Sequence, residues 1–144
     1  MRVVVDTNVF VSALIRGEGA SREVLRLCLR RGLEPLMGAA LFAEYESVLG
    51  RDELFRRSPL DSSQREVVFN AFVSVCRWTR IYYLWRPNLR DEADNHVIEL
   101  AVAGGARAIV TKNIRDFRAS DLRFPDLHVL RPDALFQEMD TWER

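Results

Sequence analysis

Val3-Val4-Val5-Asp6-Thr7-Asn8 is the stretch that decides the fold of this 144-residue chain. Three β-branched apolar residues in a row are typical of a short strand buried on both faces, as in the middle of a parallel sheet. The strand ends on an acid, and catalytic groups collect at the carboxyl ends of strands in open α/β sheets. We therefore expect Asp6 to lie at a functional edge of the sheet. Capping of the following helix by Asp6 or Asn8 would explain the same residues, and this stretch alone does not separate the two interpretations.

Outward from this stretch, strand-like and helix-like segments alternate along the chain. Apolar runs predict further strands at residues 34–37, 81–85, 106–111 and 127–130. Helical patterns lie between them, at residues 9–15, 21–31, 39–49, 61–78 and 91–103 and from Pro132 onward. This alternation predicts an α/β domain whose parallel sheet is joined by right-handed crossovers.

Composition narrows the classes of function. The 21 basic and 21 acidic residues cancel, so nucleic-acid binding would depend on a local patch and not on a global basic field. Cys28 and Cys76 have no CxxC spacing and are expected to be reduced core residues. No leader pattern or membrane-length apolar run is present, so we expect a cytoplasmic protein without membrane attachment.

One further acid stands out on the predicted helix 39–49. Glu44 lies beside Leu41 and Val48 by the i±3 and i±4 rule, so it is nearer the packed side of the helix than Glu46. The alternative is a rim glutamate with its carboxylate in solvent.

Asp91, Glu92 and Asp94 crowd the start of another predicted helix. A favourable interaction with the helix dipole explains their charge but not their crowding. Asp94 is also in line with Ile98 and Ala101, which is an inward direction. A carboxylate on the core side needs a partner, and a divalent cation is one candidate.

These positions are expected to meet at one edge of the sheet. Asp6, Glu44, Asp91 and Asp94 would converge there with Asn113, which follows the strand at residues 106–111. Carboxylates in such proximity raise each other's pKa unless a cation is present. Hard oxygen ligands without cysteine or paired histidine favour Mg²⁺ or Mn²⁺, and such a site suits phosphoryl transfer or phosphodiester hydrolysis.

Four segments together resemble the successive motifs of the PIN domain. They are Val-Val-Val-Asp-Thr-Asn-Val-Phe-Val-Ser at residues 3–12, Ala-Glu-Tyr-Glu-Ser-Val-Leu at 43–49, Asp-x-x-Asp-Asn at 91–95 and Ile-Val-Thr-Lys-Asn-Ile-Arg-Asp-Phe at 109–117. Each motif is weak alone, but their order is specific, and the resemblance runs from Val3 to Leu130. The chain is most similar to the bacterial and archaeal toxin components of toxin-antitoxin systems, relatives of the VapC-type ribonuclease toxins.

The resemblance implies a single PIN domain over residues 1–144, with a three-layer α/β/α fold around a central, mostly parallel sheet. It also implies a metal-dependent ribonuclease whose catalytic acids are Asp6, Glu44 and Asp94. The implied ligands of Mg²⁺ or Mn²⁺ are Asp6, Glu44, Asp91, Asp94 and Asn113, with Thr7, Asn8 and Ser12 hydrogen-bonded around them. The implied partners are RNA, a small antitoxin protein whose C-terminal segment enters the acidic groove, and a second copy of the chain in a homodimer.

One residue departs from the family pattern. Many relatives have Val-Thr-x-Asp in the fourth motif, where this chain has Asn113. An amide oxygen can ligate a hard cation but brings no negative charge, so a second metal would bind less tightly. Lys112 and Arg115 beside it are candidate RNA-binding residues, with solvated surface charges as the alternative. His96 has no spaced partner and is expected to pack or lie at the surface.

Two other functions stay open at this stage. A catalytically weak PIN domain would bind RNA or a protein without cutting, and Asn113 is the residue that supports it. A haloacid-dehalogenase-like phosphatase also begins with a strand ending in Asp, but it needs a second acid where this chain has Asn8.

Overall fold

The computed structural model describes residues 1–81, 95–118 and 126–142. Within them, parallel strands form one sheet in the order β3-β2-β1-β4-β5. The strands are β1 (Arg2–Val5), β2 (Glu34–Met37), β3 (Arg77–Trp78), β4 (Ala108–Val110) and β5 (His128–Leu130). β1 is central, and Val3, Val4 and Val5 are no more than 3% exposed. The prediction of a buried central strand in a parallel sheet is confirmed.

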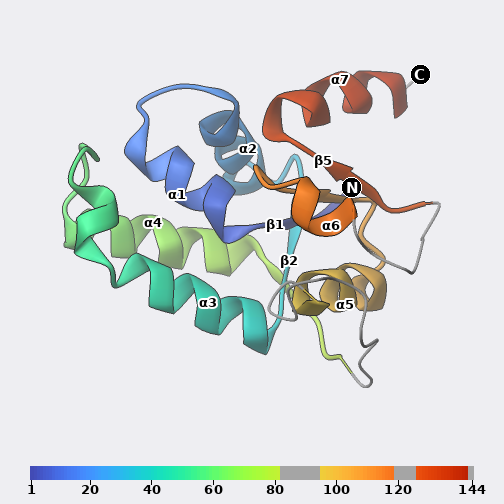
Figure 1. Ribbon diagram of the computed structural model, residues 1–144, viewed down its shortest axis with the longest axis horizontal. Coiled ribbons are helices and arrows are strands. Elements are labelled where there is room, and N and C mark those ends of the chain that lie inside the picture. Colours follow the sequence, from blue (N-terminus) through green and yellow to red (C-terminus); the bar gives the residue numbers. More distant parts are fainter. Residues whose placement is uncertain (82–94, 119–125, 143–144) are drawn as a thin grey trace.

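Helices cover the sheet on both faces (Figure 1). The first face carries α1 (Thr7–Ile15), α2 (Ala20–Leu29) and α4 (Ser62–Val75), and α7 (Pro132–Trp142) packs against α2. On the other face α5 (Asn95–Gly104) contacts β1, β2 and β4, and α6 (Arg115–Arg118) precedes β5. The chain crosses from β1 outward to β3 and then returns to β4 on the other side of β1. With right-handed crossovers, this reversal places the helices of the two halves on opposite faces and opens a crevice between the ends of β1 and β4.

α3 (Ala39–Leu49) links the sheet to α4 through a short 3₁₀ helix, η1 (Asp52–Phe55). An aromatic cluster holds these helices to α1. The Tyr45 ring lies 5.2 Å from Phe10 and 5.6 Å from Phe69, and Phe72 lies 5.1 Å from Phe10, measured between ring centroids. These edge and stacked contacts fix the rotation of α3 about its own axis, so they also fix where Glu44 points.

Local signals set several helix ends as predicted. Asp61 and Gln64 form the predicted capping box at the start of α4. Gly105 follows α5 with a φ of +68°, and the Ala106 amide donates to the Ala101 carbonyl. Glycine adopts this left-handed turn without the strain that a Cβ would bring, so the predicted stop at Gly104-Gly105 is confirmed.

Other boundaries differ from the prediction. The third strand is Arg77–Trp78, whereas 81–85 was predicted; Ile81 is outside any strand, and the rest of that segment lies outside the described residues. α4 therefore ends at Val75 and not near Trp78. β3 pairs with β2 through only two residues, which is too short for a hydrophobic pattern to reveal.

The second helix also differs slightly. α2 begins at Ala20 after Gly19, and it ends at Leu29. Its left-handed residue is Arg31 and not Gly32. Across the described helices, none has the length and apolar character needed to cross a membrane.

Candidate active site

Asp6 lies where β1 ends and α1 begins. Its Oδ1 accepts a hydrogen bond of 2.8 Å from the Thr7 amide, and its Oδ2 accepts one of 2.8 Å from the Thr111 hydroxyl. The side-chain nitrogen of Asn8, Nδ2, lies 3.4 Å from the same Oδ2. Asp6 therefore caps α1, as one interpretation predicted, and it also lies at the carboxyl end of the central strand, as the other interpretation requires.

Glu44 reaches the same place from α3. The Thr7 hydroxyl donates to Glu44 Oε1 at 2.8 Å, so Thr7 touches both acids, one through its amide and one through its side chain. Tyr45, the next residue, points the other way into the core and donates to the Val5 carbonyl at 2.6 Å. This bond ties α3 to the end of β1, one residue before Asp6.

The loop after β4 closes the site on another side. Thr111 is fully buried, and its hydroxyl oxygen also accepts from the Asn113 amide at 3.0 Å and from Asn8 at 3.3 Å. The Lys112 amide donates to Asn8 Oδ1 at 3.0 Å. Asn8 thus binds both the first acid and the loop, which fixes the distance between β1 and β4 at their carboxyl ends.

The two carboxyl groups have opposite pKa shifts. Burial raises the pKa of Asp6, the hydrogen bond from Thr111 opposes that rise, and the charge of Glu44 adds to it. The pKa of Glu44 is lowered, chiefly by its hydrogen bond with His96 and against partial burial. A buried carboxyl beside an ionised one is the arrangement that a cation would relieve.

His96 was expected to pack or lie at the surface, and the structure gives it a partner in the site. Its Nε2 lies 2.7 Å from Glu44 Oε2. Thr111 is also absent from the residues that the sequence singled out. Its position at the end of the strand beside β1 was a usable signal, whereas the contact of His96 depends on how α3 and α5 pack.

The remaining predicted residues are dispersed around this centre. Ser12 accepts from the Lys112 ammonium at 3.2 Å and contacts neither acid. Asn113 and Arg115 are exposed, the latter at the start of α6. Asp91 and Asp94 lie outside the described residues.

A divalent cation fits the chemistry of the described part of the site. Within residues 1–81, 95–118 and 126–142, no group of three or more His, Cys, Asp or Glu side chains forms a metal cluster by itself. Asp6 and Glu44, however, offer hard oxygen donors that are held by Thr7, and the pKa of Asp6 is raised first by burial and then by the charge of Glu44. The two acids would form part of such a site.

Solved structures with the same fold share little sequence with this chain. A structure described as VapBC2 from Rickettsia felis bound to a DNA fragment from their promoter matches with a TM-score of 0.59 and 17% identity, over 90% of this chain and 97% of that one. FitAcB from Neisseria gonorrhoeae matches with a TM-score of 0.54 and 15% identity, over the same shares of 90% and 97%. Identity this low shows the fold alone.

The family is shown by sequence. No curated protein matches the chain significantly. A family model described as "PIN domain" matches residues 2–115, which span β1, α3, α5 and the loop after β4, and with them the described site. The match leaves the phosphatase alternative without support, and the chain belongs to the PIN domain family.

Proposed function

We propose that this protein is a metal-dependent endoribonuclease that hydrolyses RNA phosphodiester bonds, and that it is the toxin of a toxin-antitoxin pair. The observation that carries the proposal is the convergence of Asp6 and Glu44 on Thr7 at the carboxyl end of the central strand. Nuclease activity is general among PIN domains. The finer assignment to RNA is supported by the resemblance of the four motifs to VapC-type toxins.

In this proposal Asp6 and Glu44 hold Mg²⁺ or Mn²⁺, together with Asp94 and with Asp91 or Asn113 as further ligands. When bound, such a cation would supply the positive charge that activates water and offsets the charge of the scissile phosphate. Asp94 and Asp91 enter through their positions in the third motif. Asn113 enters through its position in the fourth motif.

The other residues have positioning roles. Thr111 and the Thr7 amide fix the carboxylate of Asp6, so that its oxygens keep one orientation toward a ligand. His96 does the same for Glu44. Lys112 and Arg115, which follow β4, are proposed to bind phosphates of the RNA, because a carboxylate pair alone would repel a polyanion.

The partners of this chain are proposals of the same kind. A small antitoxin protein would inhibit the enzyme, and the protein would form a homodimer, as the resemblance to VapC-type toxins implies. The fold match to the VapBC2 structure supports the proposal of an antitoxin partner.

Cleavage of RNA by the purified protein tests the proposed function. We would incubate labelled structured and single-stranded RNA with Mg²⁺, Mn²⁺ or EDTA, beside the variant Asp6→Asn. Cleavage that needs the metal and is lost in the variant supports the proposal. Cleavage that persists in EDTA or in Asp6→Asn contradicts it.

The exposed Asn113 favours a second candidate, a PIN domain that binds RNA without cutting. The two candidates differ in the effect of Asn113→Asp. Gain of cleavage in this variant, from a wild type that binds RNA without cutting it, supports the binding module. A wild type that already cuts RNA contradicts the module.

A further inference from the structure

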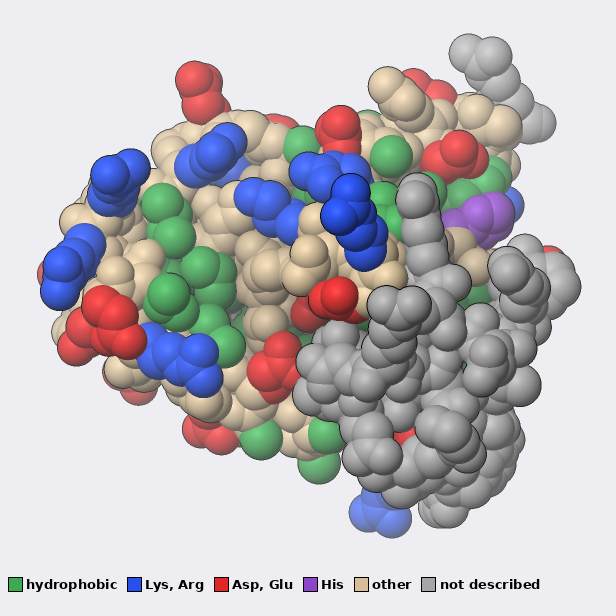
Figure 2. Space-filling view, viewed as in Figure 1, with side chains coloured by type: hydrophobic (Ala, Val, Ile, Leu, Met, Phe, Trp, Pro, Cys, Tyr) green, Lys and Arg blue, Asp and Glu red, His purple; other side chains and the backbone are tan. Residues whose placement is uncertain are grey.

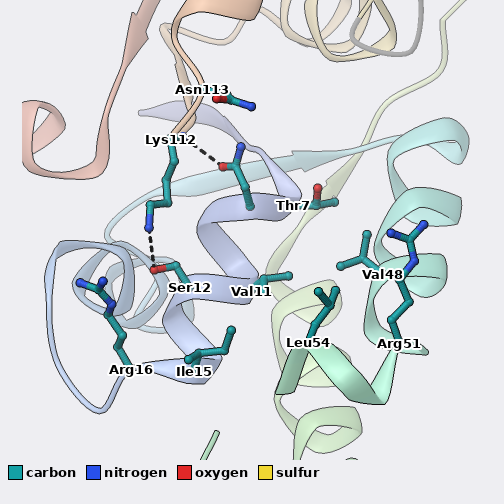
Figure 3. Close-up of a pocket in the computed structure, with 11 residues that line it drawn as sticks. Thr7, Val11, Ser12, Ile15, Arg16, Val48, Arg51, Leu54, Lys112 and Asn113 are labelled. Carbon is teal, nitrogen blue, oxygen red and sulfur yellow. Dashed lines mark hydrogen bonds between the residues drawn. The ribbon is translucent and has the colours of Figure 1, made fainter. Parts of the chain in front are cut away.

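A cavity opens directly beside the acidic pair, and the proposed function assigns no ligand to it. It has a volume of about 620 Å³ and lies between α1, α3 and η1 (Figure 3). Thr7, which binds both acids, and Asn8, which binds Asp6, are also part of its wall. The cavity is therefore continuous with the acidic centre.

The floor of the cavity is aliphatic. Val11 and Ile15 come from α1, Val48 from α3 and Leu54 from η1, and their side chains point toward one another (Figure 3). Leu54 is 40% exposed, which is unusual for a large apolar side chain. Figure 2 shows exposed hydrophobic side chains gathered on this face, with lysine and arginine side chains on several sides of them and some acidic side chains beside them. An apolar floor of this kind accepts a flat apolar group that leaves water.

The rim of the cavity is cationic. Arg16 lies on the α1 side, Arg51 on the α3 side, and the Lys112 ammonium is held over Ser12 (Figure 3). Among the described residues, none of these three cations forms an ion pair with a carboxylate. Their charge is thus available to an anionic ligand, although the chain as a whole has a net charge of +0.

The sequence of α1 explains how floor and rim are joined to the acids. Thr7, Val11 and Ile15 are spaced at i, i+4 and i+8, and they form one stripe that begins at the acidic pair. Asn8 and Ser12 lie on the adjacent polar stripe, and Arg16, the C-cap residue, follows the end of the helix. The apolar stripe runs for about 12 Å along the helix. A chain molecule whose phosphate lies at the acids can therefore continue along this groove.

We infer that this cavity receives an unpaired nucleobase of a single-stranded RNA substrate, with Arg16, Arg51 and Lys112 around the neighbouring phosphates. The inference rests on the proposed nuclease function, which places a phosphodiester at Asp6 and Glu44. A base buries its faces against apolar side chains, and the phosphates on either side are anionic, so both parts of the cavity are matched. A base in a duplex could not enter, which makes the site selective for unpaired RNA.

Binding without cleavage tests the inference. The probe is a fluorescein-labelled single-stranded RNA of about ten nucleotides, and its partner is the same strand with abasic riboses, both measured by fluorescence anisotropy in EDTA. We expect wild-type protein to bind the intact strand about tenfold more tightly than the abasic one. We expect Leu54→Ser to reduce that ratio to near one, while Val67→Ser, a change at an exposed apolar residue outside the cavity, leaves it unchanged.

The rim is tested with a second pair of variants. Arg51→Gln should lower the affinity for the intact and the abasic strand by the same factor, and it should reduce the salt dependence of binding by about one counterion. Arg57→Gln, an exposed arginine that does not line the cavity, should leave both affinities unchanged. Thermal melting confirms that each variant is folded.

Several outcomes would overturn the inference. Equal binding of the two strands by the wild type contradicts it, as does a base preference that survives Leu54→Ser. A Leu54-dependent affinity for an acidic, leucine-rich peptide, with no base preference, would make the cavity a peptide-docking groove instead.

A protein that prefers the intact strand but cuts no RNA with Mn²⁺ supports the pocket and contradicts the nuclease proposal. Cutting without base preference contradicts the pocket alone.

Discussion

At the scale of single residues, Asp6 combines burial with an unusual neighbour. Asp6 is only 6% exposed. Burial raises its pKa, and the charge of Glu44 adds to this rise. A carboxylate kept in this position costs stability when it is ionised. Functional sites commonly carry such a cost, because the same strain prepares the group for a ligand.

Replacement of Asp6 by asparagine should therefore stabilise the metal-free protein at neutral pH. The pKa of Asp6 in the folded state is above its ordinary value of 3.8. At pH values between 3.8 and that raised pKa, the folded state therefore binds more protons than the unfolded state. Wild-type stability then falls as pH rises through this window, and the variant escapes the fall. We expect the Tm of Asp6→Asn to exceed that of the wild type by about 2–4 °C at pH 7, the shift that about 1 kcal/mol produces in a domain of this size.

Thermal melting from pH 3 to pH 8, in EDTA, measures this difference. The difference in Tm should shrink as the pH is lowered toward the ordinary pKa of an aspartate. Glu44 has a lowered pKa, so its stabilising effect is lost as pH falls, in both proteins, and largely cancels in the comparison. An Asp6→Asn variant that is less stable than the wild type at every pH would show that Asp6 is mainly a structural cap.

Thr111→Val tests the hydrogen bond that opposes the shift in Asp6. The change keeps the shape of a fully buried side chain but removes the 2.8 Å bond to the carboxylate, together with the bonds that the hydroxyl accepts from Asn113 and Asn8. We expect a loss of about 2 kcal/mol in the free energy of unfolding at pH 7, because the bond is made to a charged group. The loss should be smaller where Asp6 is protonated.

Urea unfolding at two pH values measures the effect of Thr111→Val. Thr141→Val is the matched control, since the exposed Thr141 hydroxyl donates to the Gln137 carbonyl of its own helix at 3.3 Å. An equal, small loss in both variants would mean that Thr111 does not support the charge of Asp6.

At the scale of elements, Tyr45 links α3 to β1. Its ring packs in the aromatic cluster with Phe10, Phe69 and Phe72, and its hydroxyl donates to the Val5 carbonyl at 2.6 Å. Tyr45→Phe keeps the ring and removes only the hydroxyl. We expect it to lower the free energy of unfolding by about 1 kcal/mol, and to lower RNA cleavage further than this stability loss explains, because Glu44 is the preceding residue.

Urea unfolding and cleavage rates at a temperature where both proteins are folded separate these effects. A Tyr45→Phe variant with full cleavage activity would show that the aromatic contacts alone position α3.

Element boundaries show what the sequence could and could not predict. β1 was predictable because Val3, Val4 and Val5 are β-branched and uninterrupted, and α4 because its capping box is a local signal. β3 was not, because an edge strand of two residues, with Trp78 54% exposed, has no buried pattern. The apolar residues from Ile81 onward were a stronger strand signal than the pair that forms β3.

Some contacts of the candidate site could likewise be predicted from the sequence, and others could not. Asp6 and Thr111 follow neighbouring strands, so their proximity can be derived from strand order, even though only Asp6 was singled out. The pairing of Glu44 with His96 joins residues 52 positions apart on two helices, and no local pattern encodes it. The sequence therefore brought Asp6 and Glu44 forward as candidate ligands, but not Thr111 and His96, which hydrogen-bond to them.

At the scale of the whole molecule, the site depends on the reversal of strand order at β1. The crossovers bring the ends of β1 and β4 together, and α3 supplies an acid from the first half of the chain. This geometry places acids, a polar loop and a cation-rimmed cavity on one face. The central claim is that Glu44, and not Glu46 on the same helix, completes the proposed site of RNA cleavage.

The measurement that tests this claim most directly compares initial rates of RNA cleavage, with Mn²⁺, for Glu44→Gln and Glu46→Gln. Both variants remove one negative charge from α3, but Glu46 is exposed and does not line the cavity beside the acids. We predict that Glu44→Gln lowers the rate at least about 100-fold, the cost of removing one preorganised electrostatic group, while Glu46→Gln stays within about twofold of the wild type. Equal rates for the two variants would contradict the account.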